Sequence, residues 1–187
     1  MSPSTAAMPE STILAMTHQL ESLIREIPDF PKPGILFKDI TPLLADPAGL
    51  ALAVELMANP FRKAGIDLVV GAESRGFIFG TAVAQSLNCG FVPVRKPGKL
   101  PSERRSTTYD LEYGKDTLEI HADAIAGHHR VLMVDDLLAT GGTMKACCEL
   151  VNDLGGDIVG VSILIELAFL RGRDKLAPYV VESVLKY

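Results

Sequence analysis

Apolar positions follow two alternating spacings along most of the chain, and this alternation predicts an α/β fold. Runs of consecutive apolar residues are typical of strands that are buried on both faces of a parallel sheet, and they occur at residues 67–72, 90–94, 130–134 and 157–165. Helical spacing follows two of these runs, at residues 76–87 and 142–154. A last strand is predicted near residues 179–183. Strands that alternate with helices indicate a central, mostly parallel sheet flanked by helices.

The first 60 residues carry weaker signals. A helix is predicted from about residue 12 to residue 27. A rigid, non-helical loop is predicted at residues 28–34, because prolines interrupt helices. Residues 35–37 fit a short strand. Pro47 follows Asp46 at a position that favours the first turn of another helix, and Pro60 ends or kinks that helix.

Length and composition suit one globular domain with a full core, because the chain has 187 residues and is 48% hydrophobic. We predict a disordered or loosely ordered tail at residues 1–12, which are small, polar and proline-containing, and a single domain at residues 13–187. The net charge of −5 argues against nonspecific binding to nucleic acid. No apolar run is long enough to span a membrane, so no membrane association is expected.

Cysteine usage predicts a reducing compartment. The chain has an odd number of cysteines: Cys89, Cys147 and Cys148. The last two are adjacent on a predicted helix, where their side chains point apart. This pattern does not suggest a disulfide framework. A cytoplasmic location is therefore expected.

The segment VLMVDDLLATGGT, residues 131–143, carries the strongest chemical signal. A buried strand runs into Asp135 and Asp136, at the strand end where open α/β sheets bind ligands. A tight loop follows, whose N–H groups and hydroxyls can surround a phosphate at the start of a helix, and it consists of Ala139, Thr140, Gly141, Gly142 and Thr143. Carboxylates repel phosphate but accept hydrogen bonds from a diol. One ligand that carries both groups, such as a ribose 5-phosphate, reconciles the two halves.

The alternative interpretation of this segment is a tight turn with two exposed acids, which is less favoured because the combination is unusual. Other phosphate-binding motifs are excluded. Gly71 and Gly76 have the spacing of the two glycines in the P-loop motif G-x-x-x-x-G-K-[ST]. Phe77 and Ile78, however, stand where this motif requires lysine and then serine or threonine.

Two basic features point to an anionic ligand. Arg75 follows the first buried strand and could bind an anion, or it could be a surface arginine paired with Glu73. Residues 95–105 are rich in Arg and Lys, and the long polar loop at residues 96–108 is predicted to lack secondary structure. Such a loop is often a lid, although a solvated run of charges explains it equally well.

A hairpin is predicted from residues 109–113 and 117–121, turning at Gly114. Glu112 lies beside this turn. A carboxyl near a closed site could exchange a proton with a substrate nitrogen. The position by itself favours an exposed strand glutamate.

Five segments in order resemble the type I phosphoribosyltransferases, and among them the members that act on adenine: FPKPGILFKDITPLL, GAESRGFIFG, VPVRKPGKLP, LEYGKDTLEI and VDDLLATGGT. The resemblance extends from about residue 27 to the C-terminus, where GRDKLAP is also similar. V-D-D followed by A-T-G-G-T is specific to proteins that bind phosphoribosyl pyrophosphate (PRPP). Residues 30–40 narrow the base to adenine.

The resemblance implies a type I phosphoribosyltransferase fold with a flexible lid loop and a small N-terminal hood, formed mainly by residues 13–45 and a C-terminal segment. It also implies a homodimer and a glycosyltransferase of purine salvage. The implied reaction converts adenine and PRPP into AMP and pyrophosphate with Mg²⁺. The metal is held mainly by PRPP and pyrophosphate oxygens, so direct protein ligands are not expected.

The family's site residues carry over as expectations. The ribose hydroxyls face Asp135 and Asp136, and the 5-phosphate lies in the loop at residues 139–143. Pyrophosphate is held by Arg75, Lys96 and Lys99, and Arg95 acts either at the same site or across a dimer interface.

The implied base site includes four residues and a catalytic pair. Adenine lies between Phe37 and Leu137, and backbone groups near Leu36 and Lys38 read its edge. Glu112 hydrogen-bonds N7 of adenine, and Tyr113 helps to close the loop, so these two are the expected catalytic residues.

The chain departs from the family at two places. Pro101 is followed by Ser102, Glu103, Arg104 and Arg105, where relatives often have a glycine and fewer charges. Lys38 stands where arginine or glutamine is frequent. Two alternatives stay open at this point: a PRPP-binding regulator without catalysis, or transfer to another base such as hypoxanthine, xanthine or orotate, against which the hood sequence argues.

Overall fold

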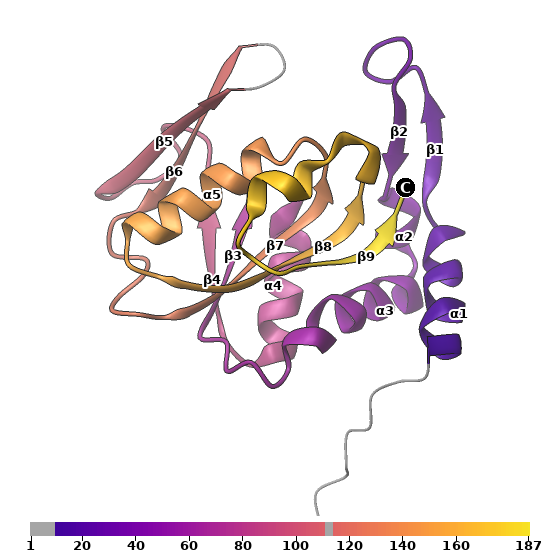
Figure 1. The fold of residues 1–187 in the computed structure, drawn as a ribbon, viewed down its shortest axis with the longest axis horizontal. Coiled ribbons are helices and arrows are strands. Elements are labelled where there is room, and N and C mark those ends of the chain that lie inside the picture. Colours follow the sequence, from indigo (N-terminus) through magenta and orange to yellow (C-terminus); the bar gives the residue numbers. More distant parts are fainter. Residues whose placement is uncertain (1–9, 111–113) are drawn as a thin grey trace, which may run out of the picture. The chain divides into compact units, whose positions relative to one another are not determined.

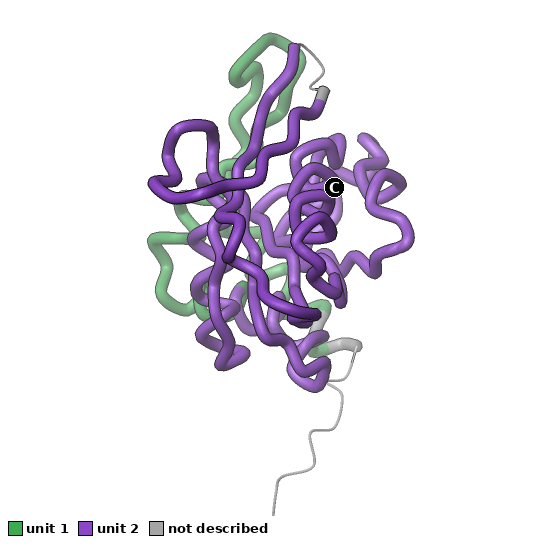
Figure 2. Tube along the Cα trace, turned by 90° about the vertical axis from the view of Figure 1, so that its left-hand side faces the viewer, with its two compact units in different colours: residues 1–53 green, residues 54–187 purple. Residues whose placement is uncertain are grey.

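The computed structural model describes residues 10–110 and 114–187. The chain forms two compact units, Met1–Ala53 and Val54–Tyr187, which Figure 2 shows in different colours. Helix α3 (Pro47–Ala58) contributes residues to both. The single domain predicted for residues 13–187 stays a prediction.

The first unit contains a two-stranded hairpin between short helices. Its elements are α1 (Glu10–Glu21), β1 (Arg25–Pro28), β2 (Leu36–Asp39) and α2 (Thr41–Ala45). The strands are antiparallel, and Ile27 lies opposite Phe37. The helix predicted up to residue 27 is therefore wrong in its last part, because the backbone of β1 is used in pairing with β2. Short apolar runs fit helix and strand equally, and long-range pairing decides between them.

The second unit is built on a parallel five-stranded sheet, as predicted. The strand order is β4-β3-β7-β8-β9, and every neighbouring pair is parallel. The strands are β3 (Leu68–Ala72), β4 (Gly90–Val94), β7 (Arg130–Leu138), β8 (Asp157–Glu166) and β9 (Val181–Lys186). Figure 1 shows α4 (Gly76–Leu87) and α5 (Gly142–Asp153) on opposite faces of this sheet.

The core of the second unit explains the long apolar runs in the sequence. Central strands covered by helices on both faces bury side chains of both orientations, so they do not alternate between apolar and polar residues. Consecutive residues 131–134 of β7 are fully buried. Phe79 of α4 and Leu150 of α5 are also fully buried.

Among the described residues, the remaining elements are a hairpin and three short 3₁₀ helices. The hairpin pairs β5 (Arg104–Asp110) with β6 (Lys115–His121), and the 3₁₀ helices are η1 (Asn59–Phe61), η2 (Ala168–Leu170) and η3 (Gly172–Leu176). The prediction of an irregular loop at residues 96–108 is wrong in its second half. Arg104 lies opposite His121 in an antiparallel ladder, and a polar strand gives little signal in the sequence.

Candidate functional site

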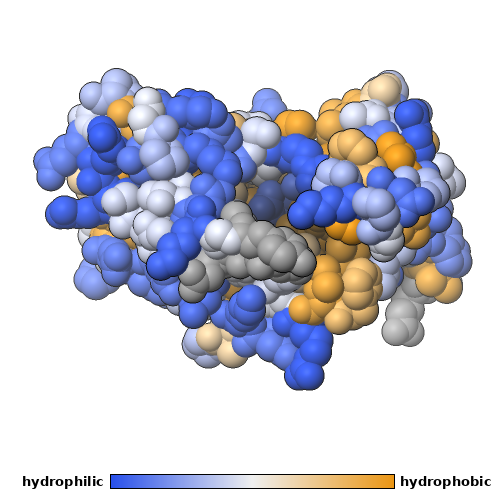
Figure 3. Space-filling model, turned by 90° about the horizontal axis from the view of Figure 1, so that it is seen from above, coloured by the Kyte–Doolittle hydropathy of each residue, from blue (hydrophilic) through white to orange (hydrophobic). Residues whose placement is uncertain are grey.

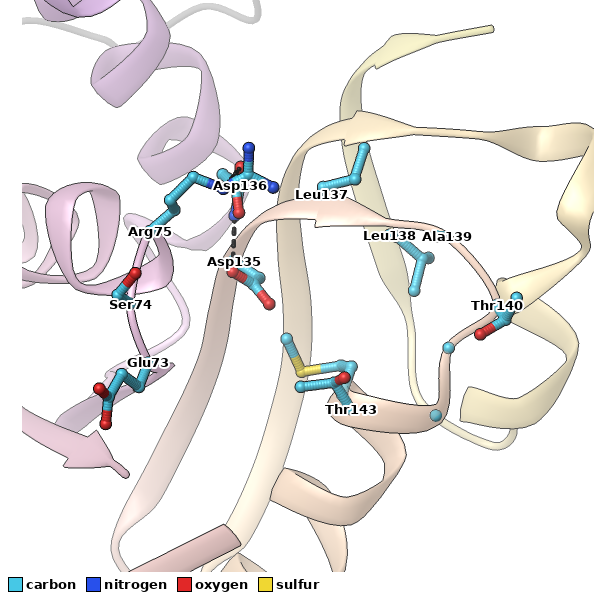
Figure 4. A pocket seen from close by; sticks show the side chains of 13 residues that line it. Glu73, Ser74, Arg75, Asp135, Asp136, Leu137, Leu138, Ala139, Thr140 and Thr143 are labelled. Atoms are coloured by element: carbon cyan, nitrogen blue, oxygen red, sulfur yellow. Dashed lines mark hydrogen bonds and ion pairs between the residues drawn. The ribbon is translucent and has the colours of Figure 1, made fainter. Parts of the chain in front are cut away.

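Three segments of the second unit surround a pocket of about 380 Å³ (Figure 4). They are the turn between β3 and α4, the end of β7, and the loop from β7 into α5. The lining residues are Glu73, Ser74, Arg75, Asp135, Asp136, Leu137, Leu138, Ala139, Thr140, Gly141, Gly142, Thr143 and Met144. The pocket therefore lies at the carboxyl ends of β3 and β7, where parallel α/β sheets bind ligands.

The acid pair, Asp135 and Asp136, lies within β7 rather than after it. The prediction ended this strand at residue 134, but Leu137 and Leu138 continue its pairing with β8. The two acids are neighbours on this strand, and their carboxyl groups interact through a side-chain hydrogen bond. Asp136 is buried, and Asp135 is half-buried.

Two interactions fix the acid pair. Arg75 Nε lies 3.0 Å from Asp136 Oδ2, and the backbone N–H of Asp136 donates to Asp135 Oδ1 at 2.9 Å. Burial raises the pKa of Asp135, and the neighbouring charge of Asp136 adds to that shift. Burial also raises the pKa of Asp136, although Arg75 opposes the shift. Groups that donate hydrogen bonds to these oxygens would favour their charged form.

The phosphate loop, residues 139–143, begins α5. Gly141 is the residue before the helix and has φ +79°, a left-handed conformation that suits glycine. The N–H groups of the first helical turn have no partner within the helix and can bind an anion. Thr143 Oγ1 lies 3.1 Å from the hydroxyl of Tyr109 on β5, so the hairpin contacts this loop.

A second backbone segment supports the phosphate loop from outside the pocket. A Cβ atom on Gly172 would overlap the carbonyl oxygen of Ala139, and a Cβ atom on Gly141 would overlap the carbonyl oxygen of Gly172. The two backbones therefore pack directly against each other. Arg173, the next residue, forms two hydrogen bonds with Glu166 at the end of β8. This arrangement restricts the shape that the loop can adopt.

Glu73 joins the pocket to the cation cluster, which we define as Arg95, Lys96 and Lys99. Its carboxylate accepts hydrogen bonds from Lys99 Nζ, from Arg95 Nε at 3.2 Å and from the backbone N–H of Lys96 at 3.0 Å. Burial alone would raise the pKa of Glu73, but these hydrogen bonds outweigh it and lower the pKa to about 2. Glu73 is thus an anion at neutral pH.

The structure brings most of the predicted PRPP residues to one pocket. Its lining includes Arg75, the acid pair and the whole phosphate loop, together with Leu137. The cation cluster is not part of the lining but is attached to it through Glu73.

Apart from Leu137, the predicted base residues lie outside the pocket lining. Leu36, Phe37 and Lys38 lie on β2 of the first unit, where the ring of Phe37 packs edge-to-face on Phe30. Glu112 and Tyr113 lie outside the described residues, so their roles stay predictions.

Sequence reasoning gave no role in the site to Glu73, Tyr109 or Gly172. The alternative interpretation of Arg75 treated Glu73 only as its partner, and the interactions of Glu73 with Lys99 and Arg95 join residues more than 20 positions apart. Gly172 stands in the GRDKLAP segment, whose similarity to the family was the available signal.

Comparison with known proteins gives consistent matches. Residues 39–185 match the family model of the phosphoribosyl transferase domain. The chain is 58% identical to the adenine phosphoribosyltransferase of Koribacter versatilis, over 96% of this chain and 99% of that protein. It is 59% identical to the adenine phosphoribosyltransferase of Rhodopirellula baltica, over 88% of this chain and 80% of that protein.

Solved structures show the same similarity. The adenine phosphoribosyltransferase of Thermoanaerobacter pseudethanolicus has a TM-score of 0.89 and 51% identity, covering 91% of this chain and 99% of its own. The enzyme of Saccharomyces cerevisiae, solved with D-2,5-dideoxy-2,5-imino-altritol 1,6-bisphosphate and adenine, has a TM-score of 0.87 and 40% identity. That match covers 92% of this chain and 99% of the yeast chain.

Proposed function

Because this chain belongs to the phosphoribosyl transferase domain family, we propose that it transfers the 5-phosphoribosyl group of PRPP to adenine, giving AMP and pyrophosphate. The family indicated by the sequence motifs is confirmed, and the fold is that of the type I phosphoribosyltransferases. The protein is a pentosyltransferase, and its reaction is a step of purine salvage. The acid pair and the phosphate loop in one pocket are the observation that carries this proposal.

PRPP fits the pocket by the chemistry of its two ends. The ribose 2- and 3-hydroxyls donate hydrogen bonds to Asp135 and Asp136, which are acceptors when ionised. The 5-phosphate accepts hydrogen bonds from N–H groups and hydroxyls of the phosphate loop. Burial disfavours the charged form of both carboxyls, so hydroxyl donors from the diol would stabilise their charge.

Catalysis then depends on the charges that develop as the bond from C1 to pyrophosphate breaks. Positive charge grows on the ribose, and negative charge grows on the leaving group. Arg75, Lys96 and Lys99 are proposed to stabilise the leaving group, with Arg95 beside them. A lid that excludes water prevents hydrolysis of PRPP, and we assign this role to the segment after residue 95.

Mg²⁺ is the proposed metal. Within the described parts of the chain, no group of three or more His, Cys, Asp or Glu side chains could hold a metal ion. The two carboxylates of the acid pair are assigned to the ribose hydroxyls, so we do not propose them as direct ligands of the ion. We propose that PRPP and pyrophosphate oxygens provide most of its ligands. When bound, the ion neutralises charge on the leaving group.

The adenine contacts are proposed from the family resemblance. Phe37 and Leu137 would contact the ring, and backbone groups of Leu36 and Lys38 would read its edge. A backbone N–H and C=O give a pattern that adenine satisfies and hypoxanthine mismatches. Glu112 is the proposed partner of N7, which favours loss of the N9 proton, and Tyr113 would help to close the site.

We also propose a cytoplasmic homodimer. The three cysteines are free, which suits a reducing compartment. In residues 10–110 and 114–187 no helix is both long and apolar enough to cross a membrane. Apolar areas lie on the face seen in Figure 3, and large exposed apolar side chains of the second unit include Ile78, Phe169 and Val180. Exposed apolar surface favours association between chains.

One assay tests the proposed function. The protein is incubated with Mg²⁺, PRPP and one of adenine, hypoxanthine, xanthine or orotate, and pyrophosphate release is measured. We expect release with adenine and formation of AMP. Pyrophosphate release with another base and not with adenine would show that adenine is not the substrate. PRPP binding without pyrophosphate release would favour a non-catalytic regulator.

A further inference from the structure

Glu73 is a half-buried acid in a site proposed to bind the most highly charged part of the substrate. Its side chain is 11% exposed, and it lines the pocket beside Ser74 and Arg75 (Figure 4). An acid at this place needs an explanation, because a carboxylate and pyrophosphate repel each other. Glu73 has none of the roles proposed above in binding the diol, the 5-phosphate or the base.

The partners of Glu73 are the groups assigned to pyrophosphate. Lys99 Nζ and Arg95 Nε both donate to its carboxylate, as does the backbone N–H of Lys96. These three donors come from one segment, residues 95–99, which follows β4. Glu73 follows the neighbouring strand β3, so its carboxylate ties the start of the proposed lid to the edge of the pocket.

The other proposed pyrophosphate ligands are also paired with carboxylates. Arg75 pairs with Asp136, and the ammonium of Lys96 pairs with Asp116 on β6. Asp136 has a proposed role towards the ribose, and Asp116 is not among the residues that line the pocket. Glu73 alone among these three acids both lines the pocket and binds two of the cations.

We propose that Glu73 is the internal counter-ion that pyrophosphate must displace from Lys99 and Arg95, and that it thereby limits how tightly the leaving group is held. This inference rests on the proposed function. A carboxylate and a phosphate oxygen need the same N–H donors, so they compete for them. After the reaction Glu73 can take the donors back, which favours departure of the product.

The opposite role would be to preorganise the cations for binding. The two roles predict opposite signs for one substitution, Glu73→Gln, which keeps the shape and removes the charge. If Glu73 competes, the variant binds pyrophosphate more tightly because Lys99 and Arg95 lose their counter-ion. If Glu73 preorganises, the variant binds it more weakly.

The test measures the Kd of pyrophosphate with Mg²⁺ by calorimetry on the full chain. We expect E73Q to lower the Kd about tenfold, and E73D, which keeps the charge, to stay near the parent protein. The control is E55Q, which makes the same change of charge at a glutamate paired with Arg62 outside the pocket lining. Equal or weaker binding by E73Q than by E55Q would overturn the proposal.

Two further measurements keep the result interpretable. Glu73→Ala replaces E73Q if that variant does not fold. In a Lys99→Gln background, E73Q should tighten binding much less, because the main donor is gone. Failure of the proposed function is a separate outcome: the parent protein would then form no AMP from adenine and PRPP, whatever its affinity for pyrophosphate.

Discussion

Arg75 Nε lies 3.0 Å from Asp136 Oδ2, so an acid proposed to bind the ribose holds a cation proposed to bind the leaving group. Both residues line the pocket: Arg75 lies in the turn between β3 and α4, and Asp136 lies on β7. One PRPP molecule can therefore form hydrogen bonds with both side chains. Its diol donates to Asp136, and its pyrophosphate accepts from Arg75.

Asp135→Asn and Asp136→Asn should each weaken PRPP binding. An amide presents one acceptor oxygen and an N–H₂ group that cannot accept from a hydroxyl. Loss of a hydrogen bond to a charged group is worth about 1.5–3 kcal/mol, which corresponds to roughly 10- to 150-fold in Kd. Calorimetry with PRPP measures the effect, with the exposed Asp123→Asn as control. Unchanged affinity in both variants would refute the assignment of the diol.

The same substitution at Asp135 should stabilise the protein without ligand. Burial raises the pKa of Asp135, so the folded state binds more protons than the unfolded state between the ordinary and the raised value. Stability therefore falls as pH rises through this window, and the loss persists above it. We expect Asp135→Asn to have a higher Tm than the parent at pH 7 and a similar Tm near pH 3. A lower Tm at pH 7 would contradict the burial argument.

Glu166→Gln should destabilise the protein most above the ordinary pKa of glutamate. Hydrogen bonds from Arg173 at 2.6 and 3.0 Å and from Ser183 at 2.6 Å lower the pKa of Glu166. The stabilisation is present above the unfolded-state pKa and is lost as pH falls through the folded value. We expect a loss of about 1–3 kcal/mol at pH 7.

The check is denaturant unfolding of Glu166→Gln at pH 7 and at about pH 3. The difference from the parent should shrink at the lower pH. Glu182→Gln on β9 is the control, because Glu182 is exposed. A difference that does not depend on pH would show that Glu166 stabilises the fold by its packing rather than by its charge.

Gly172→Ala should raise the KM for PRPP while leaving the KM for adenine nearly unchanged. The added Cβ would overlap the carbonyl oxygen of Ala139, so the phosphate loop or η3 must shift. A displacement of about 1 Å in a substrate-positioning loop can cost about 10²-fold in rate. Gly155→Ala is the control, since its φ of +81° strains an alanine in open space without touching the loop. Steady-state kinetics with either substrate varied separates the effects, and equal changes in both KM values would count against a role in the loop.

Glu112→Ala should lower kcat by about 10²- to 10⁴-fold if Glu112 exchanges a proton with adenine. Removal of this carboxylate leaves N7 without its proposed partner, while PRPP contacts stay intact. Kd for PRPP should accordingly match the parent. Glu21→Ala on α1 serves as control. A near-normal kcat would remove Glu112 from catalysis.

Local sequence predicted the regular elements of the second unit well. The helix at residues 76–87 and the strand at residues 90–94 have the predicted bounds, because their apolar periodicity is strong and both ends carry turn signals. Weaker patterns failed. The last part of the first predicted helix is β1, and the polar strand β5 was predicted as loop. In both cases the partner strand lies elsewhere in the sequence and supplies the hydrogen bonds.

The site divides in the same way. Asp135, Asp136 and the phosphate loop are contiguous, so a single segment of sequence determined their chemistry and the family. The acids lie inside β7 because β7 stays paired with β8 as far as Leu138, which lies opposite Glu166. Glu112 could be assigned only by resemblance, and it lies outside the described residues.

The sequence by itself determined a parallel α/β fold, a ribose-phosphate site and the phosphoribosyltransferase family, because each depends on residues that are neighbours in the chain. Only the tertiary structure decided which charges meet. Arg75 forms an ion pair with Asp136, and Glu73 forms ion pairs with Lys99 and Arg95. The tertiary structure also places the backbone of Gly172 against the phosphate loop. Glu73 is 22 positions from Arg95 and 26 positions from Lys99 in the sequence. Periodicity and spacing report on neighbours along the chain, whereas packing of the strands decides which distant side chains share an environment.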